Sequence, residues 1–98
     1  MADLRFEWGP QKNRTNQRKH GVSFEEAETD FADERAVLLD DPDHSASEDR
    51  FLLLGFSAGL RTLVVCHCYR ETEETIRIIS ARKATRSERR EYAQRWEP

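Results

Sequence analysis

The sequence predicts an α+β domain in which a mostly antiparallel β-sheet carries two N-terminal helices and one C-terminal helix. Three observations predict this class. Strand-like runs separated by short turns fill the second half of the chain, capping signals open helices on both sides of them, and no βαβ alternation is present. A chain of 98 residues is long enough to form one hydrophobic core but not two. We therefore expect residues 1–98 to form a single domain.

A short strand and a polar helix come first. Residues 4–8 alternate apolar and charged side chains, which is the pattern of a half-buried strand. Gly9 and Pro10 suit an N-cap and a first helical position, and Gly21 suits a helix stop, so a helix is predicted over residues 10–20. This helix has no apolar stripe, so at least one of its faces should meet solvent or a charged ligand.

A second helix is predicted to open at a capping box formed by Ser23 and Glu26. Phe24, Ala27 and Phe31 are spaced as one apolar helix face. A short apolar strand at residues 36–39 and an acidic, proline-containing loop at residues 40–49 follow.

Three strands are predicted next, at residues 50–57, 61–69 and 75–81. The turn at residues 58–60 is short enough to make the first two antiparallel, and residues 70–74 suit a second hairpin connection.

A basic helix is predicted to close the domain. Thr85 and Glu88 form a second capping box, and the helix should run to about Trp96. Tyr92 and Trp96 lie four residues apart, so they form one aromatic side that suits the core or a partner.

Charge is segregated along the chain although its net value is only −3. Residues 28–49 hold nine acids and one base, whereas residues 77–98 hold seven bases and three acids. Because binding responds to local potential, a basic patch can exist on this acidic protein. No apolar run is long enough for a membrane span and no signal peptide is visible, so we expect a cytoplasmic protein.

The motif Cys66-His67-Cys68 resembles a metal-binding motif, but successive residues of a strand point to opposite faces of the sheet. His67 should therefore point away from both cysteines, and neither a metal site nor a disulfide framework is predicted. His67 should share a face with Tyr69 near the exposed end of the strand. It could exchange protons near neutral pH there, and a structural role is the alternative.

Arg77 lies between two isoleucines, where an unpaired guanidinium would be costly to bury. It should either form a salt bridge with Glu48 or Asp49, or clamp a phosphate. If the strand is regular, Arg77 shares its face with Ile79 and Ala81.

Two further positions suit anion binding. Arg82 and Lys83 come just before the capped helix, where backbone N–H groups add to their charge. Lys19 is a possible phosphate contact, whereas His20 has a structural reason to stand at a helix end.

Three stretches resemble the BrnT toxin family over nearly the whole chain, in order and in spacing. They are residues 6–8 followed by Lys12, Asn16 and residues 19–27; residues 48–51 with Gly55 and Ser57; and residues 77–84. Gly9 departs from the aspartate usual in the family and replaces one N-cap with another.

The resemblance implies a fold like that of RelE-type ribonucleases, an RNA-cleaving activity that stops translation, and neutralisation by a BrnA-like antitoxin. It also implies that the antitoxin complex binds operator DNA. As a hypothesis, the RNA 2′-hydroxyl attacks the adjacent phosphate, and neither a metal nor another cofactor is needed. His67 would transfer a proton, and Arg77 and Arg82 would stabilise the charge that builds on the phosphate. The RNA backbone would be held by Lys19, Arg50, Arg70 and Lys83.

Two alternative functions would not require the chain to be an enzyme. The chain could be an inactive binding module that acts only as co-repressor with an antitoxin, or it could bind DNA directly. The acidic centre and the lack of a recognisable helix-turn-helix argue against direct DNA binding. The acidic residues 28–49 should not touch RNA, and they either contact the basic part of an antitoxin or keep the chain in solution.

Overall fold

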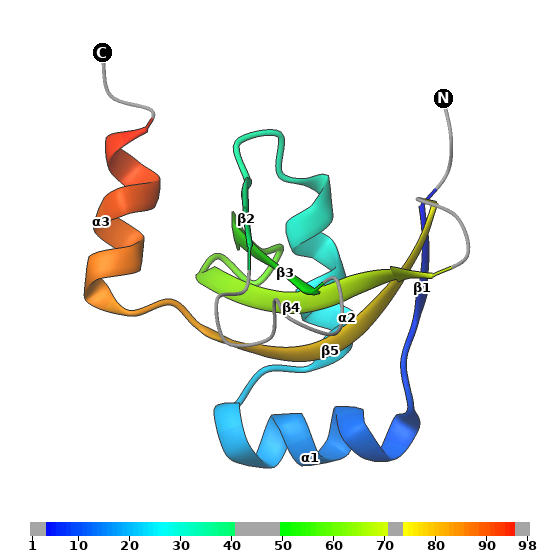
Figure 1. The fold of residues 1–98 in the computed structure, drawn as a ribbon. Coiled ribbons are helices and arrows are strands. Elements are labelled where there is room, and N and C mark those ends of the chain that lie inside the picture. Colours follow the sequence, from blue (N-terminus) through cyan, green and yellow to red (C-terminus); the bar gives the residue numbers. More distant parts are fainter. Residues whose placement is uncertain (1–3, 41–49, 71–73, 96–98) are drawn as a thin grey trace.

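A computed structural model describes residues 4–40, 50–70 and 74–95, and Figure 1 shows how these segments fold. The helices and strands follow the predicted order β-α-α-β-β-β-β-α, with one short 3-10 helix, η1, after the second α-helix. Their bounds are Arg5–Glu7 for β1, Pro10–His20 for α1, Phe24–Thr29 for α2, Asp30–Ala32 for η1, Val37–Asp40 for β2, Arg50–Phe56 for β3, Thr62–Arg70 for β4, Thr75–Lys83 for β5 and Arg86–Gln94 for α3.

The strands form one five-stranded sheet in the order β1-β5-β4-β3-β2. Strands β3, β4 and β5 pair antiparallel, as the short turns predict. Strand β2 also pairs antiparallel with β3, but β1 pairs parallel with β5. The α+β class is therefore confirmed, and the sheet is mixed. Among the described residues no helix is long and apolar enough to cross a membrane.

Helix α1 lies along one side of the sheet (Figure 1) and is fixed by buried asparagines rather than by an apolar stripe. The Asn16 amide donates to the carbonyls of Val22 and Ala81, both at 2.8 Å, and its oxygen accepts from the Ala81 N–H at 3.1 Å. Strand β1 pairs only with residues 75–77 of β5. Beyond the end of β1, the Asn16 side chain provides hydrogen-bond partners for the backbone N–H and carbonyl of Ala81 in β5. Both predicted ends of α1 are confirmed, with Gly9 as N-cap and Gly21 left-handed at φ 69°.

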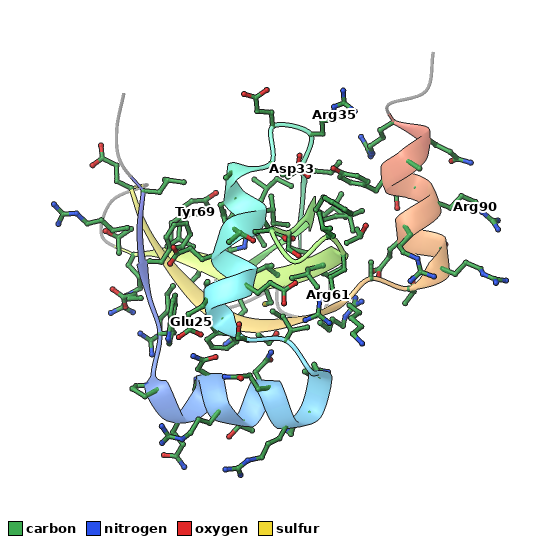
Figure 2. All side chains as sticks on the ribbon, turned by 180° about the vertical axis from the view of Figure 1, so that it is seen from behind. Glu25, Asp33, Arg35, Arg61, Tyr69 and Arg90 are labelled. Atoms are coloured by element: carbon green, nitrogen blue, oxygen red, sulfur yellow. The ribbon has the colours of Figure 1, made fainter. Side chains whose placement is uncertain are left out.

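The main core lies between the sheet and α2, which Figure 2 shows in front of the strands. Phe24 and Ala27 of α2 are buried against Leu63, Val65 and Ile78. The capping box predicted for this helix forms only in half.

The half that forms is the N-cap, where the Ser23 hydroxyl accepts from the Glu26 N–H at 3.0 Å. The Glu26 carboxylate turns away from the cap. It binds the Arg61 guanidinium at 2.6 and 2.8 Å and accepts from the Ser57 hydroxyl at 2.6 Å. This network joins the start of α2 to the β3–β4 turn.

Helix α3 contacts the rest of the domain through Tyr92. The capping box of Thr85 and Glu88 is confirmed, but no described residue of α3 is buried. The Tyr92 hydroxyl donates to Asp33 at 2.5 Å, and its ring packs beside Leu54 and Val64 on the sheet face opposite α2. Trp96, its predicted aromatic neighbour, lies outside the described residues.

A buried acid lies at the end of α2. Asp30 is fully buried, and neither of its carboxyl oxygens has a well-aligned hydrogen bond from the described residues. Burial, helped by the charges of Asp33 and Glu26 and opposed in part by the nearby Gly55 amide, raises the pKa of Asp30 to about 8. A Cβ atom at Gly55 would lie 3.2 Å from the Asp30 carboxyl, so a larger residue there would require Asp30 to shift by a few tenths of an ångström.

Candidate functional site

Four side chains, three of them charged, form a row across four strands. The register sets Arg50 of β3 opposite Cys68 of β4, Cys68 opposite Arg77 of β5, and Arg77 beside Glu7 of β1. Laterally paired residues point to the same face of a sheet, so all four side chains lie on the face opposite α2. Cys68 is small and stands between two arginines, which leaves a depression with a guanidinium on each side.

This depression belongs to a cleft of about 440 Å³, which we call the basic cleft. Its charged lining comes from Lys12 of α1 and from Arg50, Arg70 and Arg77 of the sheet. The rest of its lining is Cys68, Tyr69 and Ile79. No described acid lines the cleft, so its field favours anions, and planar guanidinium groups suit the oxygens of a phosphate.

Glu7 pairs with two of these arginines from the edge of the cleft. Its carboxylate accepts from Arg77 Nη1 at 2.9 Å and lies 3.6 Å from Arg70 Nε. The Arg77 side chain is still 34% exposed, and this bond uses one of five guanidinium N–H groups. Arg77 can therefore donate to an anion while it stays paired. Glu48 and Asp49, the partners considered from the sequence, lie outside the described residues.

An irregularity in β5 changes the predicted face of Ala81. Cys66 pairs with Ser80 and His67 pairs with Ile78, so Ile79 is an extra residue in β5. Because of this β-bulge, Ala81 points into the core, whereas Arg77 and Ile79 line the basic cleft. The prediction of one shared face is wrong for Ala81, because it assumed regular alternation.

A second groove adjoins the basic cleft along α1. It measures about 460 Å³, includes Lys19 and His20, and shares Lys12 and Ile79 with the cleft. The structure thus brings Arg50, Arg70 and Arg77 together and sets Lys19 in the adjoining groove.

His67 lies elsewhere, and the expectation that it stands near an exposed strand end is wrong. Its side chain is fully buried, with the ring of Phe31 at 4.8 Å and the rings of Phe51 and Tyr69 at about 6 Å. Burial lowers the pKa of His67, opposed in part by a 3.1 Å hydrogen bond between Nδ1 and the Val65 carbonyl. Its Nε2 atom has no described partner. Strand alternation predicted its face but not that η1 covers it.

Arg82 and Lys83 also lie outside the basic cleft. Arg82 forms a double hydrogen bond with Glu88 at 2.8 and 3.0 Å, and this contact lowers the pKa of Glu88 to about 2. Lys83 pairs opposite Leu63, whose side chain lies in the core on the α2 side of the sheet. Neither cation converges with Arg77.

A concavity of about 930 Å³ is larger than the basic cleft. It surrounds η1 and is lined mainly by apolar side chains, among them Phe6, Phe31 and Phe56, with Glu28 and Asp33. We favour the smaller basic cleft as the functional site because three arginines and a lysine line it among the described residues. No three described histidine, cysteine or acidic residues gather in a way that could hold a metal ion.

Two residues of the site did not stand out in the sequence. Lys12 reaches the cleft because Asn16 fixes α1 against β5, and no local pattern reveals that contact. Glu7 reaches it through the parallel pairing of β1 with β5. The alternation of residues 4–8 put Glu7 on the polar face of its strand and was the available signal.

Comparisons with known proteins agree on one family. The family model described as "Ribonuclease toxin, BrnT, of type II toxin-antitoxin system" matches residues 8–88. The crystal structure of the Brucella abortus ribonuclease toxin BrnT is similar, with a TM-score of 0.66 and 26% sequence identity. That match covers 85% of this chain and 99% of the Brucella chain. No curated protein matches the sequence.

Proposed function

Because the chain belongs to the BrnT family of ribonuclease toxins of type II toxin–antitoxin systems, we propose that it is a metal-independent endoribonuclease whose basic cleft binds the RNA phosphodiester. The observation that carries this proposal is the row of Arg50, Cys68 and Arg77 across three strands. Two arginines flank a small residue there, and all three line a cleft without described acids.

RNA carries its own nucleophile, the 2′-hydroxyl, so the protein has to orient the backbone and stabilise charge rather than activate water. Arg77 and Arg50 are proposed to stabilise the negative charge that builds on the phosphate oxygens. Each well-placed donor of this kind contributes roughly 10²–10³-fold to the rate. Arg70 and Lys12 hold the same phosphate group from the sides.

The adjoining groove along α1 gives the RNA strand a path away from the cleft. Lys19 lies in this groove, and Lys12 lines both concavities. A phosphate next to the scissile one would meet Lys19 in this arrangement. The catalytic roles expected for His67 and Arg82 are left out of the proposal, because His67 is buried and Arg82 does not line the basic cleft.

The family implies an antitoxin partner. We propose that this partner is BrnA-like, that it suppresses cleavage when it binds, and that the free toxin inhibits translation by destroying RNA. The competing function is a catalytically inactive chain that acts only as co-repressor with the antitoxin.

The test is to incubate the purified chain with purified total RNA, with and without EDTA, and separately with a cell-free translation reaction that keeps its magnesium. We expect RNA fragments in both RNA samples, because the proposed chemistry needs no metal, and loss of translation in the cell-free reaction. Adding the antitoxin should prevent both effects.

The control is Arg90→Ala on α3, because Arg90 points away from the sheet (Figure 2) and lies outside both grooves. It should cleave like the wild type. Cleavage that disappears with EDTA would contradict metal independence. A folded wild-type chain that cuts no RNA in either setting would favour the co-repressor function.

A further inference from the structure

We propose that Glu7 is the proton acceptor for the RNA 2′-hydroxyl. This inference rests on the proposed ribonuclease function and goes beyond it, because a row of cations explains binding and charge stabilisation but provides no base. Of the three histidines, His67 is buried and His20 lies in the groove along α1, while His44 lies outside the described residues.

The register of the sheet directs Glu7 toward the site. β1 pairs parallel with β5, and the paired residues are Glu7 and Arg77. Side chains of laterally paired residues share a face, so the Glu7 carboxylate lies on the cleft side of the sheet while its neighbour Phe6 packs against Phe31 on the other side. Adjacent strands lie about 4.8 Å apart, so Glu7 is one strand beyond Arg77 in the same row.

The contacts of Glu7 hold it beside a phosphate bound in the cleft. Its carboxylate is 2.9 Å from Arg77 Nη1 and 3.6 Å from Arg70 Nε, and both arginines line the cleft. A phosphate that binds the remaining N–H groups of Arg77 or Arg70 therefore shares a guanidinium with the Glu7 carboxylate and lies next to it. The side chain is 39% exposed, which leaves it open to a ribose hydroxyl.

The step balances without a metal or a redox partner. The Glu7 carboxylate takes the proton of the 2′-hydroxyl, and the 2′-oxygen forms a bond to phosphorus. The bond between phosphorus and the 5′-oxygen breaks, and the leaving 5′-oxygen takes a proton from water. The hydroxide that remains neutralises the proton on Glu7, so the carboxylate is restored, and the products end in a 2′,3′-cyclic phosphate and a 5′-hydroxyl.

A purely positioning role, in which Glu7 only holds Arg77 in place, makes a different prediction. Glutamine keeps an amide oxygen that can accept from Arg77, but it cannot take a proton at neutral pH. Aspartate keeps the carboxylate on a shorter side chain. Glu7→Gln therefore separates proton transfer from positioning, and Glu7→Asp tests whether a carboxylate restores the rate.

The experiment measures two quantities for the full chain, the cleavage rate of an RNA oligonucleotide and the affinity for the same sequence with 2′-O-methyl groups throughout. We expect Glu7→Gln to cleave roughly 10²–10⁴-fold more slowly than the wild type, which is the usual contribution of general acid–base catalysis. Its affinity should be equal or higher, because a negative charge beside the cleft is lost. Glu7→Asp should recover part of the rate.

Glu91→Gln is the matched control, since Glu91 is an exposed carboxylate of α3 paired with Arg95. It should change neither quantity. Cleavage by Glu7→Gln at a rate close to that of the wild type would overturn the proposal, and so would a loss of affinity that accounts for the whole loss of rate. In both results the wild type still cuts RNA and the ribonuclease function stands. A folded wild-type chain that cuts no RNA would overturn the function itself.

Discussion

Replacing Arg77 with alanine is expected to lower the rate of RNA cleavage by roughly 10²–10³-fold, the effect of removing one charge-stabilising donor. Arg77 lies in the row of side chains across the sheet, between Cys68 on one neighbouring strand and Glu7 on the other. Its loss removes a donor to the phosphate and also releases the carboxylate at the edge of the cleft. Single-turnover cleavage of an RNA oligonucleotide measures the change.

Arg77→Lys refines this prediction, because lysine keeps the charge but loses the planar pair of donors. We expect a rate between those of the wild type and Arg77→Ala. Thermal unfolding of each variant shows whether the fold survives the loss of the contact with Glu7. A folded Arg77→Ala protein with wild-type cleavage would mean that the cleft does not hold the reacting phosphate.

The second large effect concerns stability, and it comes from Asp30. Its pKa of about 8 in the folded protein lies above the value of 3.8 for an unperturbed aspartate. Between about pH 4 and pH 8 the folded chain keeps this proton and the unfolded chain has lost it. Stability therefore falls as the pH rises through this window, by up to about 1.4 kcal/mol per pH unit from this one group.

Asp30→Asn should remove this dependence, because an amide does not titrate. We expect the variant to gain stability over the wild type as the pH rises from 5 to 8, provided that the amide fits the space beside Gly55. Urea unfolding at both pH values measures the difference. Glu34→Gln, which changes an exposed acid, should keep the wild-type slope. An unchanged slope in Asp30→Asn would show that another group carries the dependence.

The sequence predicted the elements whose signals are local. Pro10 and Gly21 set the ends of α1, and Thr85 with Glu88 set the start of α3, because turns and caps depend on residues within a few positions. The parallel pairing of β1 with β5 was not predicted, since it joins segments about 70 residues apart. The likeness to RelE-type ribonucleases stays a prediction.

The candidate site was predicted in part, for the same physical reason. Arg50, Arg70 and Arg77 could be proposed from their residue type and the family resemblance, and the fold brings them together. His67 was misjudged because alternation gives the face of a side chain but not what covers it. The pairing of Arg82 with Glu88 was not predicted, because it is a contact between separate elements, and the role expected for Arg82 stays a prediction.

The most direct test of the proposed cleft is an NMR titration of the arginine side-chain Nε–H signals with the 2′-O-methyl RNA oligonucleotide. We expect the signals of Arg50, Arg70 and Arg77 to shift as the RNA binds, while those of Arg61 and Arg90 stay in place. Shifts confined to the arginines of α3, with the three signals of the basic cleft unchanged, would contradict the claim that this cleft binds the phosphodiester.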